Sequence, residues 1–350
     1  MTVFGTALVF IVILSIVILA HEFGHLLAAK RAGIRVYELA MGMGPRLWFL
    51  LRNKTIYALN LFPIGGYVRI AGLDEESEEK DPARPEECFN AKSLPQRFMT
   101  IFCGPLFNLL LGFIIFAVIF SYFGRPQGVS NEIAAVNAGS VAERAGLKIE
   151  DKLVSINGQA LPMEKMIDVI HTSQGKKLAL TIDRGGKTIS ITAAPQYNPK
   201  LKIALLGFSP QALYVRENPF SSLYYAFMHT VELSVMILVI LGALIIGKVS
   251  VTDLAGPLGI AQMTGQVASS GGFVAISQFT AFLSINLAIV NLIPLPALDG
   301  GRLFFILLSA IIRRPINPVI EAKIHQWGLI ALLILLVLLT GNDFRRIFIH

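Results

Sequence analysis

Two histidines and one glutamate form the motif His21-Glu22-x-x-His25, which follows 18 uncharged residues of the chain. On a helix, positions i and i+4 share one face, so His21 and His25 can each offer an imidazole nitrogen to one metal ion. Glu22 would then project beside that metal as a base for its bound water. Ionisable groups in an apolar span are costly and mark places where they pair, bind an ion or do chemistry. The motif therefore predicts a hydrolytic zinc site.

A catalytic zinc site needs a third protein ligand and one open position. Asp299, in the stretch NLAIVNLIPLPALDGGRL, is the only acidic residue between Asp253 and Glu321. Prolines before it and glycines after it would interrupt a helix, and interruptions at membrane depth are tolerated where they are buried in protein or line a wet cavity. We expect Asp299 to be the third zinc ligand. The alternative is a loop aspartate that caps a helix beginning near Arg302.

The remaining histidines and the two cysteines have no companion at ligand spacing, and the cysteines form neither a zinc knuckle nor a disulfide framework. We interpret these histidines as surface or interfacial residues and give the cysteines no role. They are His171, His229, His325 and His350, with Cys88 and Cys103.

The composition is that of an integral membrane protein, with 54% hydrophobic and 15% charged residues among 350. The net charge of +7 comes from basic residues in loops beside apolar stretches, so we expect no nucleic acid as a partner. A membrane crossing takes about 20 mostly apolar residues. Four stretches are long enough to supply one: residues 3–20, 101–123, 254–298 and 324–342.

The charges that follow the first stretch predict the topology. Lys30, Arg31 and Arg35 place residues 30–97 in the cytoplasm, so the N-terminus and residues 127–215 lie outside. To meet the histidines, Asp299 must lie on the same side of the membrane as His21. Only one net crossing can therefore separate the external residues 127–215 from Asp299. We assign that crossing to residues 273–298. Residues 224–247 carry several polar side chains, and we expect them to lie along the interface or to re-enter from outside.

Two features are expected in the first cytoplasmic segment. Residues 55–72, TIYALNLFPIGGYVRIAG, hold two β-prone runs around turn residues 63–66, which predicts a hairpin. Residues 74–87 are charged and contain proline, which predicts a solvated loop.

Residues 127–215 have the composition of a soluble α+β domain inserted between membrane parts. Short β-rich runs alternate with glycine turns, and KLALTIDRGGKTISITAAP predicts a hairpin around residues 184–186. The run GSVAERAGLKIEDKLVSINGQ resembles the PDZ modules of bacterial envelope proteases. That resemblance implies capture of a peptide by strand addition.

The whole arrangement resembles the site-2 proteases, which are intramembrane zinc metalloproteases, and among them the bacterial regulator of sigma-E protease group. HEFGH matches the zinc motif of that family and ALDGG matches its second metal motif. FCGPLFNLLLG, residues 102–112, resembles its second span. YELAMGMGPRLW, residues 37–48, together with residues 55–72 resembles its re-entrant β element. Relatives with two PDZ domains exist, whereas this chain has room for one.

The resemblance implies roles for single residues. His21, His25 and Asp299 become ligands of Zn²⁺, and Glu22 becomes the general base. Asn291 and Pro294 match positions that handle substrate beside the active site. Asn108 matches a position in the second span, where packing through an interhelical hydrogen bond is an equal alternative.

The sequence therefore predicts a polytopic α-helical membrane protein with about four transmembrane helices, a re-entrant β-hairpin element and one inserted PDZ domain. Its parts are an N-terminal membrane part (1–126), an extracytoplasmic PDZ domain (127–215) and a C-terminal membrane part (216–350). The location expected is the bacterial cytoplasmic (inner) membrane.

The expected function is zinc-dependent cleavage of the transmembrane segments of single-span membrane proteins in the lipid bilayer. The resemblance implies anti-sigma factors or signal-peptide remnants as substrates. Two alternatives are a membrane zinc transporter, which needs several polar spans along a path, and a catalytically silent PDZ-bearing scaffold, which has no need of Glu22.

Overall fold

The computed structural model describes residues 2–73, 83–199, 203–250, 254–314 and 316–348, so part of the loop expected at 74–87 lies outside the described residues. The chain forms two compact units. The first comprises Met1–Ile119 and Leu223–His350, and the second comprises Phe120–Ser222.

Among the described residues, five helices are long and apolar enough to cross a membrane, so the structure offers one candidate more than the four expected. The first of these helices is capped by Thr2, whose side chain accepts a hydrogen bond from the Gly5 N–H. Lys30 and Arg31 occupy its last turn, where their positive charges interact favourably with the helix dipole. The five helices are α1 (Val3–Arg31), α2 (Leu94–Tyr122), α5 (Pro219–Ile245), α7 (Gly272–Leu292) and α9 (Pro318–Phe348).

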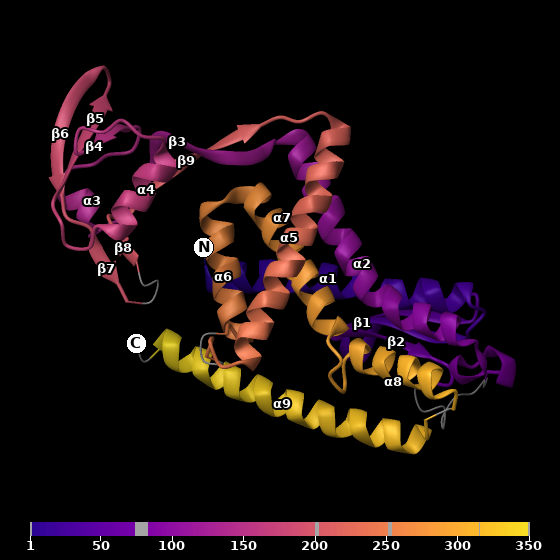
Figure 1. The fold of residues 1–350 in the computed structure, drawn as a ribbon. Coiled ribbons are helices and arrows are strands. Elements are labelled where there is room, and N and C mark those ends of the chain that lie inside the picture. The colour runs from indigo at the N-terminus through magenta and orange to yellow at the C-terminus, as the bar shows by residue number, and fades with distance from the viewer. Residues whose placement is uncertain (1, 74–82, 200–202, 251–253, 315, 349–350) are drawn as a thin grey trace. The chain divides into compact units, whose positions relative to one another are not determined.

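The additional candidate is α5, which covers most of residues 224–247, the segment expected to lie along the interface or to re-enter from outside. The helix has 27 mostly apolar residues, so its length and composition suffice for a crossing. Glu232 is exposed and His229 packs against the ring of Phe116 in α2, so α5 lies beside α2 (Figure 1). Polar residues on its surface do not shorten the helix.

Residues 254–298 contain two helices, and the crossing assigned to residues 273–298 falls on the second of them. These are α6 (Pro257–Ser270) and α7, separated at Gly271 and Gly272, where Gly272 has a φ of +61°. After α7 the chain turns and begins α8 (Asp299–Ile312). Ile13 and Val17 of α1 pack with Phe279 of α7 in a buried cluster, which holds the start of the zinc motif helix against the helix that leads to Asp299.

The β element differs from the expected hairpin at residues 55–72. Strand β1 (Val36–Arg52) pairs with β2 (Thr55–Ile70), and residues 36–41 pair with residues 56–59 and also with residues 66–70. Ala40 faces Ala58 on one side and Tyr67 on the other, so the two runs of 55–72 flank another strand and do not pair with each other. The turn residues at 63–66 therefore carry the chain across residues 36–41.

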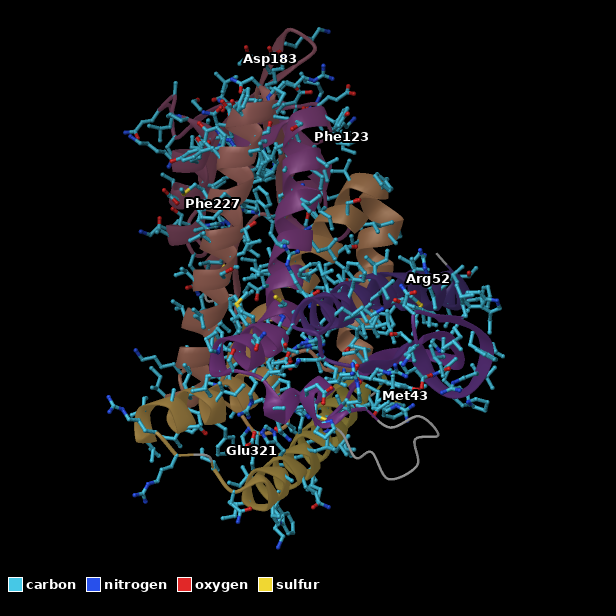
Figure 2. The ribbon with its side chains drawn as sticks, turned by 90° about the vertical axis from the view of Figure 1, so that its right-hand side faces the viewer. Met43, Arg52, Phe123, Asp183, Phe227 and Glu321 are labelled. Atoms are coloured by element: carbon cyan, nitrogen blue, oxygen red, sulfur yellow. The ribbon has the colours of Figure 1, made fainter. Side chains whose placement is uncertain are left out.

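The far end of β1 is a tight hairpin with an apolar surface. Asn53 and Lys54 both have positive φ values, as a two-residue hairpin turn requires, and Arg52 pairs with Thr55 beside it. Residues 47–51 are large apolar residues with exposed side chains. Met43 and Arg52 mark this projecting part of the first unit (Figure 2).

The edge of this sheet packs on α1. A Cβ on Gly66 would lie 3.0 Å from the side chain of Ile18, so glycine permits the close approach. Lys30 donates a hydrogen bond of 2.7 Å to the Tyr57 hydroxyl. The sheet is thereby fixed next to the zinc motif. Two short 3₁₀ turns, η1 (Pro85–Glu87) and η2 (Phe89–Ala91), precede α2.

The second unit is an α+β fold around one five-stranded sheet. Strand order is β6-β5-β4-β3-β9, and the core cluster includes Leu153, Met166, Leu180 and Ile182. The expected hairpin around residues 184–186 is formed by β5 and β6. The elements are β3 (Arg125–Val136), α3 (Val141–Arg144), β4 (Lys152–Ile156), α4 (Met163–Thr172), β5 (Leu178–Arg184), β6 (Lys187–Ala193), β7 (Gln196–Asn198), β8 (Ile203–Leu205) and β9 (Phe208–Val215).

Candidate metal centre

His21 and His25 lie one turn apart on α1 and both are buried. Their Nε2 atoms are 3.2 Å apart, and their rings meet edge to face with centroids 4.8 Å apart. The helical spacing of the motif therefore directs two imidazole nitrogens to one point.

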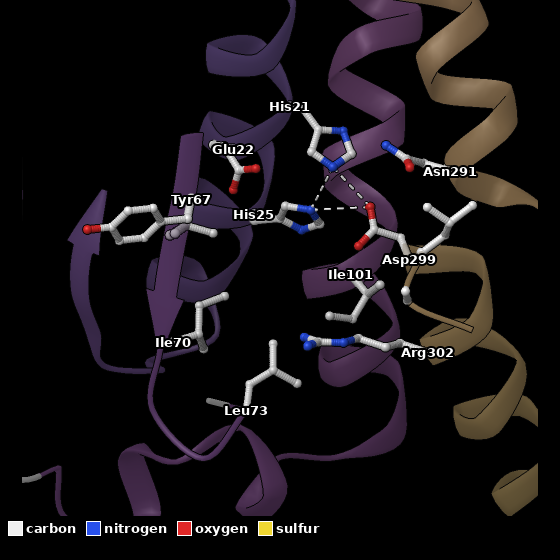
Figure 3. Close-up of a pocket in the computed structure, with 13 residues that line it drawn as sticks. His21, Glu22, His25, Tyr67, Ile70, Leu73, Ile101, Asn291, Asp299 and Arg302 are labelled. Carbon is white, nitrogen blue, oxygen red and sulfur yellow. Dashed lines mark hydrogen bonds and ion pairs between the residues drawn. The ribbon is translucent and has the colours of Figure 1, made fainter. Parts of the chain in front are cut away.

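Asp299 reaches the same point from the first turn of α8 (Figure 3). Its Oδ2 lies 3.0 Å from Nε2 of His21 and 3.4 Å from Nε2 of His25. Tetrahedral bonds of about 2.1 Å place neighbouring ligand atoms roughly 3.4 Å apart, so the three separations suit one zinc ion. Oδ2 is buried and makes no hydrogen bond within the described part of the chain, as suits an atom reserved for a metal. Two imidazoles and a carboxylate are also a donor set that zinc accepts.

The alternative role for Asp299, in which it caps a helix that begins near Arg302, is wrong. The helix begins at Asp299 itself, and Leu298 is the capping residue. The carboxylate turns instead towards the two histidines.

The outer nitrogen of each histidine has a partner on α2. Nδ1 of His25 lies 2.8 Å from the carbonyl oxygen of Thr100, and Nδ1 of His21 lies 3.4 Å from the amide nitrogen of Asn108. A carbonyl oxygen can only accept, so Nδ1 of His25 carries the proton and Nε2 keeps its lone pair for a metal. The Ser284 hydroxyl on α7 donates a hydrogen bond of 2.8 Å to the main-chain carbonyl oxygen of Asn108, which ties α7 to this pair.

Glycines let α1 and α2 approach closely enough for these contacts. A Cβ on Gly24 would collide with the Cys103 carbonyl, and a Cβ on Gly104 would collide with the His25 imidazole. Gly104 belongs to the stretch FCGPLFNLLLG, which resembled the second span of the family without revealing this role.

Glu22 lines a cavity of about 270 Å³ together with the three predicted ligands. Its carboxylate interacts with the main chain of Val68 at the sheet edge. Arg302 reaches into the same cavity from α8, and Tyr67 and Val68 line it from β2 (Figure 3). Sequence reasoning did not single out these three residues. Tyr67 and Val68 owe their place to the strand order, and Arg302 lies one turn after Asp299 on α8.

The predicted substrate residues fall in different places. Asn291, near the end of α7, lines the cavity. Pro294 is exposed in the bend between α7 and α8, apart from the described residues that line the cavity. Asn108 is fully buried and contacts His21, so it supports a predicted ligand rather than facing open space.

The side chains that were given no role lie elsewhere, with one exception. Cys88 and Cys103 are free thiols, His171 lies in the last turn of α4, and His229 is a partly exposed residue of α5 whose ring contacts Phe116. His350 lies outside the described residues. The exception is His325 on α9, which was interpreted as a surface or interfacial residue and is in fact half-buried against the loop that precedes Asp299.

Comparison with known proteins gives the family. Residues 9–335 match the model of peptidase family M50. The chain is 33% identical to the zinc metalloprotease RasP of Geobacillus kaustophilus, with 97% of this chain and 98% of that protein covered. It is 30% identical to the regulator of sigma-W protease RasP of Bacillus subtilis, with 99% of each covered.

A solved structure also matches part of the chain. The PDZ domain of an SdrC-like protein from Listeria monocytogenes is 18% identical and has a TM-score of 0.22, with 25% of this chain and 92% of that chain covered.

The match to the family model and the full-length similarity agree with the His-His-Asp group, which can hold a metal ion. The chain is a multi-pass membrane protein by the same family match and its apolar helices. It belongs to peptidase family M50, the site-2 proteases, and is an intramembrane zinc metalloprotease.

Proposed function

We propose that this protease cleaves the transmembrane segments of single-span membrane proteins at the site formed by His21, His25, Asp299 and Glu22. The observation that carries the proposal is the meeting of three ligand atoms within 3.4 Å of one another beside a glutamate, in a cavity among apolar helices. Family membership favours this function over a transporter or a silent scaffold.

His21, His25 and Asp299 would hold the zinc ion, which supplies a polarised water and polarises the scissile carbonyl. The Glu22 carboxylate takes the proton from the attacking water and later delivers it to the leaving nitrogen. Thr100 and Asn108 orient the two imidazoles. Asn291 lines the cavity and is suited to bind the main chain of the substrate; Pro294 shapes the bend that leads to Asp299.

A transmembrane helix must become extended before cleavage, because its carbonyl groups are engaged within the helix. Residues 66–70 form the edge of the sheet on the cavity side. An extended substrate that pairs with this edge would replace its lost helical hydrogen bonds with ladder bonds. The exposed apolar residues 47–51 suit a β element that dips into the bilayer.

The site would lie near the cytoplasmic face of a bacterial cytoplasmic membrane, and residues 127–215 would lie outside as a PDZ domain; the positive charges after α1 support this orientation. That domain would admit substrates already trimmed outside and exclude bulky ones. The B. subtilis relative carries the name regulator of sigma-W protease, which supports anti-sigma factors as substrates; signal-peptide remnants are the second class.

Cleavage of a tagged single-span substrate by the purified protein in detergent tests the proposal. Glu22→Gln should retain zinc and lower cleavage by at least about 100-fold, because it removes the general base. Glu232→Gln is the matched control, since Glu232 is an exposed glutamate on another apolar helix, and it should retain full activity.

Metal analysis of ligand variants completes the experiment. His21→Ala, His25→Ala and Asp299→Ala should each lose most of the bound zinc, whereas His171→Ala on α4 should keep it. Full cleavage by Glu22→Gln, or normal zinc in the ligand variants, would overturn the assignment.

A further inference from the structure

The loop that delivers Asp299 has an uncommon backbone. Residues 293–298 connect α7 to α8, and Ala297 has a φ of +74°, a conformation that L side chains rarely adopt. A residue in such a conformation persists only where its surroundings hold it there. The contacts around Ala297 therefore bear on the direction from which Asp299 enters the metal centre.

On one side, the loop packs against the start of α8. A Cβ on Gly300 would collide with the carbonyl groups of Leu292 and Ile293, and one on Gly301 would collide with that of Leu295. These glycines let the first turn of α8 lie directly on the loop.

On the other side, the loop contacts His325 of α9. The Ala297 N–H donates a hydrogen bond of 3.0 Å to Nδ1 of His325. A backbone N–H can only donate, so Nδ1 presents its lone pair to the loop. The ring of His325 also lies against Phe305 of α8, with centroids 5.7 Å apart.

Gly328, three residues further along α9, brings the helix against the same loop. A Cβ at this position would collide with Cβ of Pro296 and lie 2.8 Å from the carbon and oxygen of its carbonyl. A helix residue with any side chain would push α9 or the loop aside. Gly328 and His325 thus contact adjacent residues, Pro296 and Ala297.

The other end of α9 is anchored as well. Asp343 is fully buried and accepts a hydrogen bond of 2.8 Å from the N–H of Gly259 in the first turn of α6. The helix is therefore fixed at two points, and its position at His325 does not depend on the loop alone.

We propose that His325 and Gly328 are positioning residues for Asp299. They hold residues 293–298 in the conformation that directs Oδ2 to the two imidazole nitrogens, although neither touches the metal centre. The inference rests on the proposed metal role of Asp299, and it assigns to the last apolar helix a part in building the active site.

The experiment compares four variants of the full chain in detergent. Zinc affinity is measured by competition with a chromophoric chelator, and the geometry of the metal site is followed by the visible spectrum after Co²⁺ substitution. His325→Phe keeps a ring without the acceptor, and Gly328→Ala adds one methyl group. Both should weaken zinc binding about tenfold or more, shift the Co²⁺ spectrum and lower cleavage. His325→Asn places a carbonyl oxygen close to the position of Nδ1 and should restore most of the affinity.

Gly341→Ala is the matched control, because it makes the same change in α9 where a Cβ would meet nothing within 4 Å. It should behave as the native chain does. Native zinc affinity and spectrum in His325→Phe and Gly328→Ala would overturn the inference, as would equal damage in His325→Asn and His325→Phe. Asp299→Ala serves as a separate check: if it retains zinc, the failure lies in the proposed metal centre and not in the role of α9.

Discussion

The side-chain amide nitrogen of Asn108 lies 3.4 Å from Nδ1 of His21, on the side of the ring opposite the ligand nitrogen. When Nε2 binds a metal, Nδ1 carries a proton that needs an acceptor. The Oδ1 atom of Asn108 is buried and has no hydrogen-bond partner within the described ranges, and a half-turn of the amide brings it to this place. An amide turned in this way would accept the Nδ1 proton of a metal-bound His21.

The first prediction follows from this pair. Asn108→Leu removes the acceptor and should weaken zinc binding about tenfold, because partners of this kind orient the ligating imidazole. Asn108→Asp retains an acceptor and should bind zinc more tightly than Asn108→Leu. Chelator competition measures both. Equal zinc affinity in Asn108→Leu and the native chain would leave Asn108 with the interhelical packing role alone.

Gly104→Ala should be among the most damaging small substitutions in the chain. The added methyl group would occupy the space of the His25 imidazole, so the ring must rotate away and Nε2 would leave the metal position. We expect loss of most bound zinc and of cleavage. Gly242→Ala in α5, where a Cβ would meet nothing within 4 Å, should retain both. Zinc content and substrate cleavage measured side by side check the pair.

The sequence predicts contacts between residues that are close along the chain better than contacts between distant ones. His21, Glu22 and His25 lie within one helical turn, so their spacing alone predicts their geometry. Asp299 is 274 residues beyond His25, yet it could be found because it is the one acidic residue in a long apolar region. Rare charges in apolar sequence remain visible without the fold.

The contacts that were missed are long-range contacts of ordinary residues. Residues 36–41 enter between the two runs of 55–72, and local turn signals cannot show which strands become neighbours. His325 was left without a role because its partner is a backbone N–H 28 residues away, which has no sequence signature. For residues 224–247, the count of strictly uncharged residues left out the apolar residues that precede Leu233, so α5 became a fifth candidate for a crossing only with the structure.

Acid should destabilise the second unit through one buried carboxylate. Asp151 accepts hydrogen bonds of 2.7 and 2.8 Å from the Arg184 guanidinium, which lowers the pKa of Asp151 below its ordinary value. A carboxyl whose pKa is lowered by folding stabilises the fold above its unfolded pKa of about 3.9, and this stabilisation is lost as the pH falls through the folded pKa.

Asp151→Asn should therefore destabilise the unit by about 2 kcal/mol at neutral pH, and the difference from the native chain should shrink as the pH falls below about 4. Hydrogen exchange of amides in β4 and β5, measured in the full chain and corrected for the intrinsic pH dependence, reports it. Asp168→Asn, at an exposed position on α4, should leave the exchange unchanged at every pH. A pH-independent effect of Asp151→Asn would show that its charge is not what matters.

Residues 66–70 should be the strand to which substrate adds. Their inner side pairs with residues 36–41, and Tyr67 and Val68 line the cavity that contains Glu22. A cysteine at Tyr67, in a Glu22→Gln chain whose Cys88 and Cys103 are replaced by alanine, can be cross-linked to single cysteines placed along a substrate. An extended substrate should cross-link at every second position, since side chains alternate along a strand.

Trp48→Cys, on the segment farthest from residues 66–70 in this sheet, is the control and should give few cross-links. A spacing of three to four residues would mean that the substrate stays helical at this edge, and equal cross-linking from Trp48→Cys would mean that the edge is not the binding site.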